Sequence, residues 1–163
     1  MTQDILIVID LQNDVCEQLY QRENLLTKVN QRIAVYRAAG KPILFIQHNE
    51  IGLESGSKGW QLVPELDART TDFYMDKTHA NGFYHTNLQE LLTGLSVKNI
   101  EFCGAQTEYC VNTTLVFAHG LGYKNFMVHG ATATVDNTWL TAEKMIQFYE
   151  DKIWKHRFLE FLD

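Results

Sequence analysis

The chain has 163 residues, of which 45% are hydrophobic, enough to form the core of a single domain over residues 1–163. Its net charge of −6 and its scattered lysines and arginines argue against a nucleic-acid or anionic-membrane partner, so we expect a small-molecule partner. No apolar segment approaches the roughly 20 residues that span a bilayer, and no basic leader precedes the first apolar run, so a cytoplasmic protein is expected.

Three cysteines, Cys16, Cys103 and Cys110, form an odd set without CxxC or CxxH spacing. The sequence therefore suggests neither a disulfide framework nor a structural zinc site, which fits a reducing compartment. Cys103 lies within an apolar run and is interpreted as a small buried hydrophobic residue, and Cys16 as incidental.

The first predicted strand ends in an acidic residue. Residues 5–10 read ILIVID, a continuous apolar run typical of a strand buried on both faces, and the run ends at Asp10. Residues 25–39 then follow helical periodicity and are followed by Gly40, a common helix stop. A second buried strand, PILFIQ, is predicted at residues 42–47.

The longest predicted loop follows this second strand. Residues 48–70 are polar and carry glycines, and loops of that length usually have a function. After the loop, the short segment DFYMDK ends at Lys77. At the other end of the chain, no structure is predicted for the tail at residues 154–161. The elements between are, in order, a short helix at 87–92 that Thr86 can cap, a strand at 99–104, a helix at 110–119, a strand at 125–129, and a helix from Thr138 or Thr141 to about Asp151.

This alternating order predicts a three-layer α/β/α fold. Right-handed crossovers place helices on both faces of a central, mainly parallel sheet. The carboxyl ends of the strands then meet at one edge, where open α/β sheets bind ligands. Because Asp10 and Lys77 end their segments, we expect an acid and a base at this edge.

A third reactive residue follows the strand at 99–104. This strand stops at Gly104, and Cys110 falls where the next helix begins. The unpaired N–H groups and the positive dipole end of a helix start favour a thiolate. We therefore predict that Cys110 is a nucleophile, that Asp10 accepts its proton, and that Lys77 holds both in position.

This hypothesis requires a large electrostatic effect. Lowering the pKa of the Cys110 thiol from about 8.5 to about 6 would ionise roughly 90% of it at pH 7 and would take about 3.4 kcal/mol. A helix N-terminus supplies about 2 kcal/mol at most. Lys77, or proton transfer to Asp10, must therefore supply the rest.

Four motifs in order resemble the isochorismatase-like cysteine hydrolases, a family with a Rossmann-like fold that includes nicotinamidases, isochorismatases and N-carbamoylsarcosine amidases. The resemblance covers nearly the whole chain. The motifs are ILIVIDLQND at residues 5–14, GSKGWQLVPEL at 56–66, KTHANGFYHTNL at 77–88 and CGAQTEYCV at 103–111.

The resemblance implies a catalytic triad of Asp10, Lys77 and Cys110. It also implies a cis peptide bond between Ala105 and Gln106, and an oxyanion hole made by the backbone N–H groups of Gln106 and Cys110. Relatives often form dimers or larger assemblies, so a homo-oligomer, a dimer or tetramer, is expected. Three aromatic residues within the motifs and one residue after the second strand are predicted to line the substrate pocket, and these are Trp60, Phe83, Tyr109 and His48.

The chain departs from its relatives where some of them bind a metal. Nicotinamidases of this family hold a divalent metal through an aspartate and histidines after the second strand, whereas this chain reads QHNE with only His48. We therefore expect neither a metal nor another cofactor.

The predicted reaction is hydrolysis of an amide or carbamoyl C–N bond through a thioester on Cys110. Two alternatives stay open within the fold: an isochorismatase-type ether hydrolase, and a catalytically silent protein that binds a small molecule. A flavodoxin-like flavin binder lacks sequence support, because residues 10–16 read DLQNDVC and form no glycine-rich phosphate loop.

Overall fold

A computed structural model describes residues 1–162, so the last residue of the predicted domain, Asp163, lies outside the described residues. The strands are β1 (Ile5–Ile9), β2 (Ile43–His48), β3 (Phe73–Lys77), β4 (Asn99–Ala105), β5 (Lys124–Val128), β6 (Thr132–Ala133) and β7 (Glu160–Leu162). The α-helices are α1 (Asn13–Cys16), α2 (Arg22–Ala38), α3 (Leu88–Gly94), α4 (Asn112–Gly120) and α5 (Ala142–Phe148), and two π-helical segments are η1 (Thr107–Val111) and η2 (Tyr149–Trp154).

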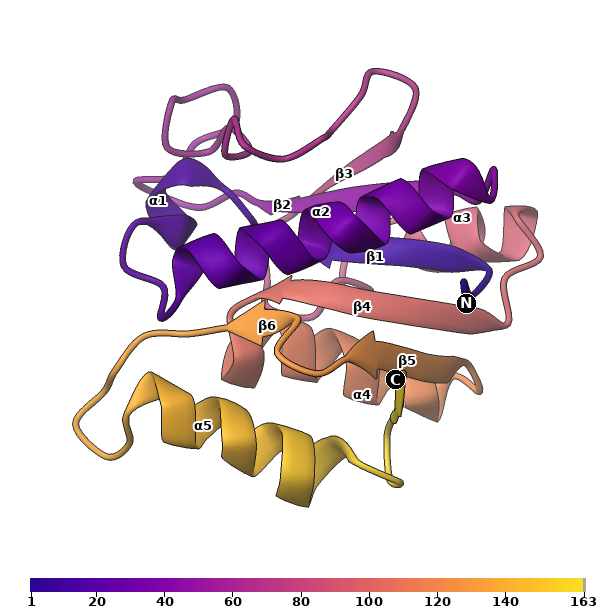
Figure 1. Cartoon of the computed structure of the whole chain (residues 1–163). Coiled ribbons are helices and arrows are strands. Elements are labelled where there is room, and N and C mark those ends of the chain that lie inside the picture. The colour runs from indigo at the N-terminus through magenta and orange to yellow at the C-terminus, as the bar shows by residue number, and fades with distance from the viewer. Residues whose placement is uncertain (163) are drawn as a thin grey trace.

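The strands form one seven-stranded sheet in which every pair is parallel. Their order is β3-β2-β1-β4-β5-β7, and β6 pairs with the end of β4. Figure 1 shows α2 across one face of the sheet and α3 and α4 behind the other. The predicted three-layer α/β fold is therefore confirmed.

The continuous apolar run of β1 is explained by its central place in the sheet. All five of its residues are buried, and the strand lies between β2 and β4 with helices on both faces. The apolar run of β2 is buried in the same way over five of its six residues. This burial fixes the position of the strand ends that carry the candidate catalytic residues.

Several predicted boundaries shift in the structure. The helix predicted at 110–119 is preceded by η1, so Cys110 lies inside a helical segment that already starts at Thr107. Thr141, rather than Thr138, caps α5 by accepting a hydrogen bond from the backbone N–H of Lys144. The C-terminal tail, for which no structure was predicted, adds β7 beside β5.

Gly104 lets two backbones approach closely beside the site. Its φ is +126°, and a Cβ at this position would lie 2.1 Å from the carbonyl oxygen of Ile9. Only glycine fits such a place without displacing the backbone of β1. The next residue after Ile9 is Asp10, so this contact sets how β4 approaches the candidate acid.

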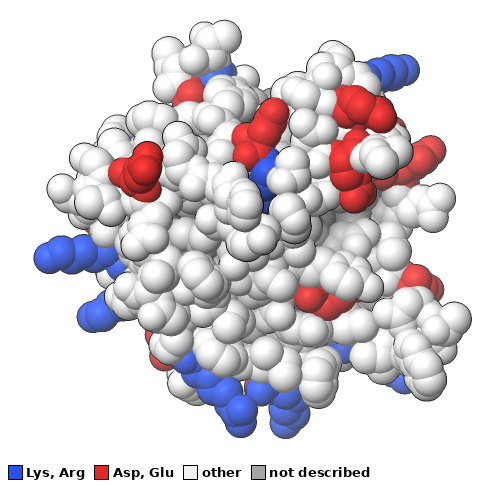
Figure 2. Space-filling model, turned by 180° about the vertical axis from the view of Figure 1, so that it is seen from behind, with Lys and Arg blue, Asp and Glu red and all other residues white. Residues whose placement is uncertain are grey.

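Within residues 1–162 no helix is both long and apolar enough to cross a membrane. Figure 2 shows Lys and Arg side chains at several places on one face of the molecule: at the left, at the lower edge, at the upper right and near the upper centre. This distribution agrees with the scattered basic residues of the sequence.

Candidate active site

Four strand ends bring the candidate residues to one edge of the sheet. Asp10 follows β1, His48 ends β2, Lys77 ends β3, and Cys110 lies in η1 after β4. These strands are adjacent and parallel in the sheet, so their carboxyl ends meet. The predicted meeting of the acid, the base and the thiol is what the structure shows.

Lys77 is the centre of the cluster. Its side chain is buried, and its Nζ lies 2.6 Å from Asp10 Oδ2, 2.9 Å from His48 Nδ1 and 3.3 Å from Cys110 Sγ. An ammonium group has three N–H donors, and each finds an acceptor here when the proton of the imidazole is on Nε2. The charge of Lys77 is therefore held in place by three partners.

Asp10 is held in an unusual backbone conformation and is 2% exposed. Its φ is 52°, in the left-handed region that aspartate tolerates better than most residues, and its N–H donates to the carbonyl of Ile46. Burial raises the pKa of its carboxyl group, while the neighbouring Lys77 acts in the opposite direction. Its second oxygen, Oδ1, is buried and has no hydrogen-bond partner within residues 1–162.

The burial of Cys110 beside Asp10 opposes the predicted thiolate at neutral pH. Burial, followed by the charge of Asp10, raises the pKa of the Cys110 thiol to about 12, although Lys77 acts to lower it. The helix start and the ammonium favour a thiolate, whereas the desolvation of the sulfur and the nearby carboxylate, which only the packed structure reveals, act in the opposite direction. Burial and the neighbouring carboxylate therefore favour the thiol form of Cys110 over the thiolate before substrate binds.

A thiol beside a buried carboxylate can still act as a nucleophile. Cys110 and Asp10 each offer a ligand atom in a group of three whose atoms lie within 4.8 Å of one another. Moving the proton from the sulfur to the carboxylate leaves the total charge of the site unchanged, with Lys77 beside both groups. Ionisation during the reaction therefore needs no exchange of charge with solvent.

His48 is the third member of the group that contains Asp10 and Cys110, and the geometry of this group is unfavourable for a metal ion. Asp10, His48 and Cys110 resemble a ligand set, but Lys77 already donates to one atom of each. A metal ion at this point would face a buried ammonium charge at close range, which is strongly unfavourable. The residues present do not fit a metal.

Gln12 ties the long loop to the site, a role that the sequence analysis missed. Its Nε2 donates to the carbonyls of His48 and Trp60, both at 2.9 Å, and its Oε1 accepts from the N–H of His48 at 2.7 Å. Gln12 is fully buried, so its amide needs hydrogen-bond partners within the protein. In the sequence, the only signal for this role was the position of Gln12, two residues after the acid that ends the first strand.

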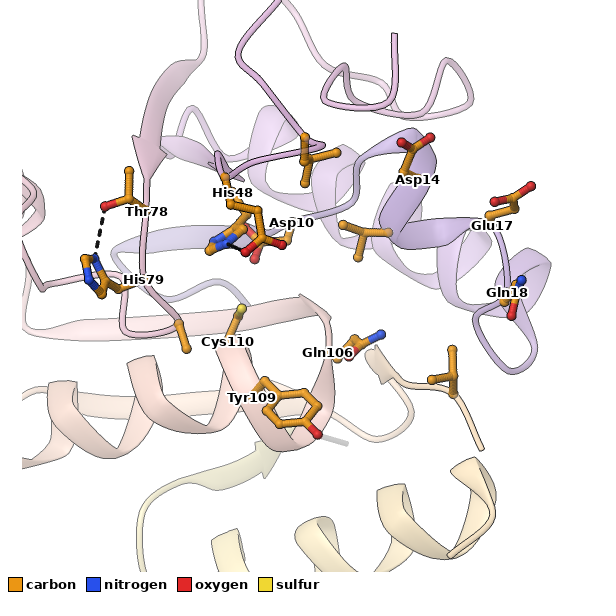
Figure 3. Close-up of a pocket in the computed structure, with 15 residues that line it drawn as sticks. Asp10, Asp14, Glu17, Gln18, His48, Thr78, His79, Gln106, Tyr109 and Cys110 are labelled. Atoms are coloured by element: carbon orange, nitrogen blue, oxygen red, sulfur yellow. Dashed lines mark hydrogen bonds and ion pairs between the residues drawn. The ribbon is translucent and has the colours of Figure 1, made fainter. Parts of the chain in front are cut away.

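A pocket of about 630 Å³ opens beside these residues (Figure 3). Of the predicted pocket residues, His48 and Tyr109 line it, together with Gln106 and Cys110. Trp60 does not line it; the backbone carbonyl of Trp60 accepts hydrogen bonds from Gln12 and Gln47. Phe83 does not line it either, because its ring packs near those of Phe117 and Tyr123, at centroid distances of 5.5 and 6.3 Å.

The turn before Cys110 presents Gln106 to the pocket. The peptide bond between Ala105 and Gln106 is cis, and the carbonyl of Gln106 accepts hydrogen bonds from the N–H groups of Tyr109 and Val111, both at 3.2 Å. Gln106 and Cys110 both line the pocket. Their predicted role as an oxyanion hole stays a prediction.

Comparison with known proteins agrees with this fold and cluster. A model of the isochorismatase domain matches residues 4–149, so the chain belongs to the isochorismatase family, whose members are hydrolases. A crystal structure of an isochorismatase family protein is 51% identical in sequence and superposes with a TM-score of 0.95. The matched region covers 98% of this chain and 97% of the chain in that crystal structure.

Two curated relatives match most of the chain. The secreted isochorismatase effector Isc1 of Verticillium dahliae is 26% identical over 154 residues, which cover 90% of this chain and 81% of Isc1. Nicotinamidase 3 of Arabidopsis thaliana is 28% identical over 146 residues, which cover 79% of this chain and 72% of the plant protein. The predicted family is therefore confirmed.

Proposed function

We propose that this protein hydrolyses a C–N bond of a small amide or carbamoyl compound through a thioester on Cys110. The observation that carries this proposal is the contact of one buried ammonium, that of Lys77, with both the carboxylate of Asp10 and the sulfur of Cys110. The name of nicotinamidase 3 adds support for amide substrates.

In the first half of the reaction, the substrate carbonyl lies against the sulfur. Cys110 Sγ attacks the carbonyl carbon while its proton passes to Asp10, and a C–S bond forms. The N–H groups of Gln106 and Cys110 stabilise the oxyanion. Asp10 then gives the proton to the leaving nitrogen, so the C–N bond breaks and ammonia or an amine departs.

In the second half, water hydrolyses the thioester. Asp10 takes a proton from the attacking water, and the C–S bond breaks with return of that proton to the sulfur. The sum of both halves is amide plus water giving acid plus amine. The raised pKa of the Asp10 carboxyl group suits it to carry a proton between steps.

Lys77 serves both halves by orientation and charge. Its three contacts fix Asp10 and Cys110 relative to each other, and its positive charge opposes the cost of a buried thiolate. Without it, proton transfer would place a negative sulfur in a desolvated site with no compensating charge.

A second candidate function is ether hydrolysis of the isochorismatase type, which the name of Isc1 favours. A catalytically silent binding protein is the remaining alternative. Ammonia release from primary amides, N-carbamoyl compounds and cyclic amides, measured for the wild type and for Cys110→Ala, tests the proposal. Release that is absent from the wild type, or equal in both proteins, overturns it, and turnover of isochorismate alone would favour the ether hydrolase.

We also propose that the chain works as a homo-oligomer, a dimer or tetramer. The support is apolar exposure: Ile51 is fully exposed next to the pocket residue Glu50, and Trp139 is 89% exposed on the loop that follows β6. Burial of such side chains against a neighbour is favourable. Light scattering of purified protein should give a multiple of the chain mass, and a monomer at micromolar concentration contradicts the proposal.

We also propose that residues 1–163 form one domain and that the protein acts in the cytoplasm. The sheet that runs from β3 to β7 and the three free cysteines support these proposals. Localisation of a tagged chain in its cells of origin would test the compartment.

A further inference from the structure

We propose that the pocket selects substrates that carry a positive charge, and that Asp14 and Glu17 are the residues that recognise the cationic group. This inference rests on the proposed function, because it specifies the amide that the Cys110 site would hydrolyse. It assigns the site a substrate class, an amide with an ammonium or guanidinium group, that the catalytic cluster alone does not define.

The lining of the pocket is rich in acidic side chains. Asp14, Glu17 and Glu50 line it in addition to Asp10, whereas no lysine or arginine within residues 1–162 does so. Figure 3 shows Asp14 and Glu17 along one side of the pocket, across from Tyr109 and Cys110.

Two of these charges have no protein partner. Asp10 is neutralised by Lys77, and Glu50 lies 3.4 Å from His48 Nε2. Asp14 and Glu17, in contrast, form no ion pair within residues 1–162. The pocket therefore keeps an excess of negative charge that an anionic substrate would have to overcome.

Asp14 is exposed at the edge of the pocket, and its carboxylate lies against the long loop. It belongs to α1, its N–H donates to the carbonyl of Gly59 at 3.1 Å, and a Cβ on Gly59 would lie 2.0 Å from Asp14 Oδ2. The glycine thus leaves room for the carboxylate against the long loop.

A separate observation at the inner end of the pocket also points to a ligand. Asp10 lines the pocket, is 2% exposed, and leaves its Oδ1 without a hydrogen-bond partner within residues 1–162. The Cys110 thiol can donate to this carboxyl group, and the N–H of a bound amide can supply a further donor to its free oxygen. The pocket thus offers an acceptor for an amide at its inner end and free carboxylates for a cation on its side.

The first test compares three amides of similar size and different charge. These are 4-aminobutanamide (cationic), pentanamide (neutral) and succinamate (anionic). We expect kcat/KM to fall in that order, and Glu17→Gln and Asp14→Asn each to lower the cationic-to-neutral ratio by about threefold, the effect of one unit charge acting through water over several ångströms. Glu90→Gln, an exposed acid on α3, is the matched control and should leave the ratio unchanged.

A second test does not depend on turnover. Cys110 is labelled separately with a cationic and an anionic methanethiosulfonate reagent. The rate with the cationic reagent is divided by the rate with the anionic reagent, and this ratio is divided by the same ratio measured for 2-mercaptoethanol, which corrects for the intrinsic reactivity of the reagents. We expect a corrected ratio above one that falls in the double variant Asp14→Asn/Glu17→Gln and not in Glu90→Gln. Cys110→Ala should remove the label, because Cys16 and Cys103 are fully buried.

The two tests separate the two proposals. A cationic preference in labelling without hydrolysis of any amide would refute the proposed function and keep the charge selectivity. Hydrolysis with no cationic preference, or a preference that survives the double variant, would refute the charge selectivity and keep the hydrolase.

Discussion

Lys77 and Asp10, which lie 67 positions apart in the chain, form a fully buried ion pair at 2.6 Å between Nζ and Oδ2. Strand β2 lies between the strands that carry them, so Lys77 must reach past the end of β2 to make this contact. His48, at that end, accepts from the same Nζ. The pair therefore depends on three strand ends staying in register.

Loss of the Asp10 charge should make Cys110 react faster with an alkylating reagent but make the enzyme hydrolyse its substrate more slowly. Asp10→Asn removes the carboxylate that raises the pKa of the thiol, so the pKa should fall. Alkylation by iodoacetamide at pH 7 should become at least about tenfold faster, equivalent to one pKa unit. Hydrolysis should drop by about 10² to 10⁴, because no group remains to carry the proton. Slower alkylation in this variant would contradict the arrangement.

The pH dependence of alkylation should follow the raised pKa of Cys110. With that pKa at about 12, the thiolate is a small fraction from pH 7 to pH 10. The rate of iodoacetamide labelling should therefore rise about tenfold per pH unit over this range without reaching a plateau. Mass spectrometry at Cys110 measures the rate, and a plateau near pH 7 would show that the thiol is ionised after all.

Removal of the Lys77 charge should cost stability as well as activity. Lys77→Met leaves the carboxylate of Asp10 buried without its partner, and breaking a buried pair in this way typically lowers the free energy of unfolding by about 3–5 kcal/mol. The double variant Asp10→Asn/Lys77→Met should recover most of this loss, because no lone charge remains. Urea unfolding of the wild type, Asp10→Asn, Lys77→Met and the double variant gives the four free energies of a double-mutant cycle. Additive losses would mean that the two groups do not interact.

A methyl group on Gly104 should disturb both the fold and the site. Its Cβ would clash with Ile9 at a φ of +126°, so Gly104→Ala should lower the free energy of unfolding by at least about 3 kcal/mol. Gly120→Ala is the control, because nothing lies within 4 Å of its added Cβ. Thermal unfolding of both variants measures the difference, and equal stability would show that β1 and β4 are less closely packed than described.

The sequence predicts the strands and the reactive residues well because both follow short-range rules. The apolar run of β1 and the residue that ends it are visible at once, and the motifs place Lys77 and Cys110 in order. The protonation of Cys110 was not predictable in the same way, because it depends on how deeply the sulfur is buried beside Asp10. Desolvation is a property of the packed molecule.

The pocket wall was predicted less well for a related reason. Aromatic residues near the motifs were expected to face the substrate, yet Phe83 packs toward α4 and Trp60 is bound through its backbone to Gln12. The acidic residues Asp14 and Glu17 instead line the pocket. The direction of a side chain on an irregular loop or a one-turn helix leaves no periodic signal in the sequence.

His48 provides a final test of how the cluster works, because two substitutions at this position separate acceptor function from size. Its Nδ1 is one of three acceptors for the Lys77 ammonium, and an asparagine side chain can place an oxygen near the same point. We expect His48→Asn to keep kcat within a few-fold and His48→Ala to lower it by about tenfold, since an ammonium proton without a partner costs roughly 1–3 kcal/mol. KM should change little if His48 acts only through Lys77. Ammonia release over a range of substrate concentrations measures both constants. Equal losses of kcat in the two variants would instead assign His48 a role that only an imidazole can fill.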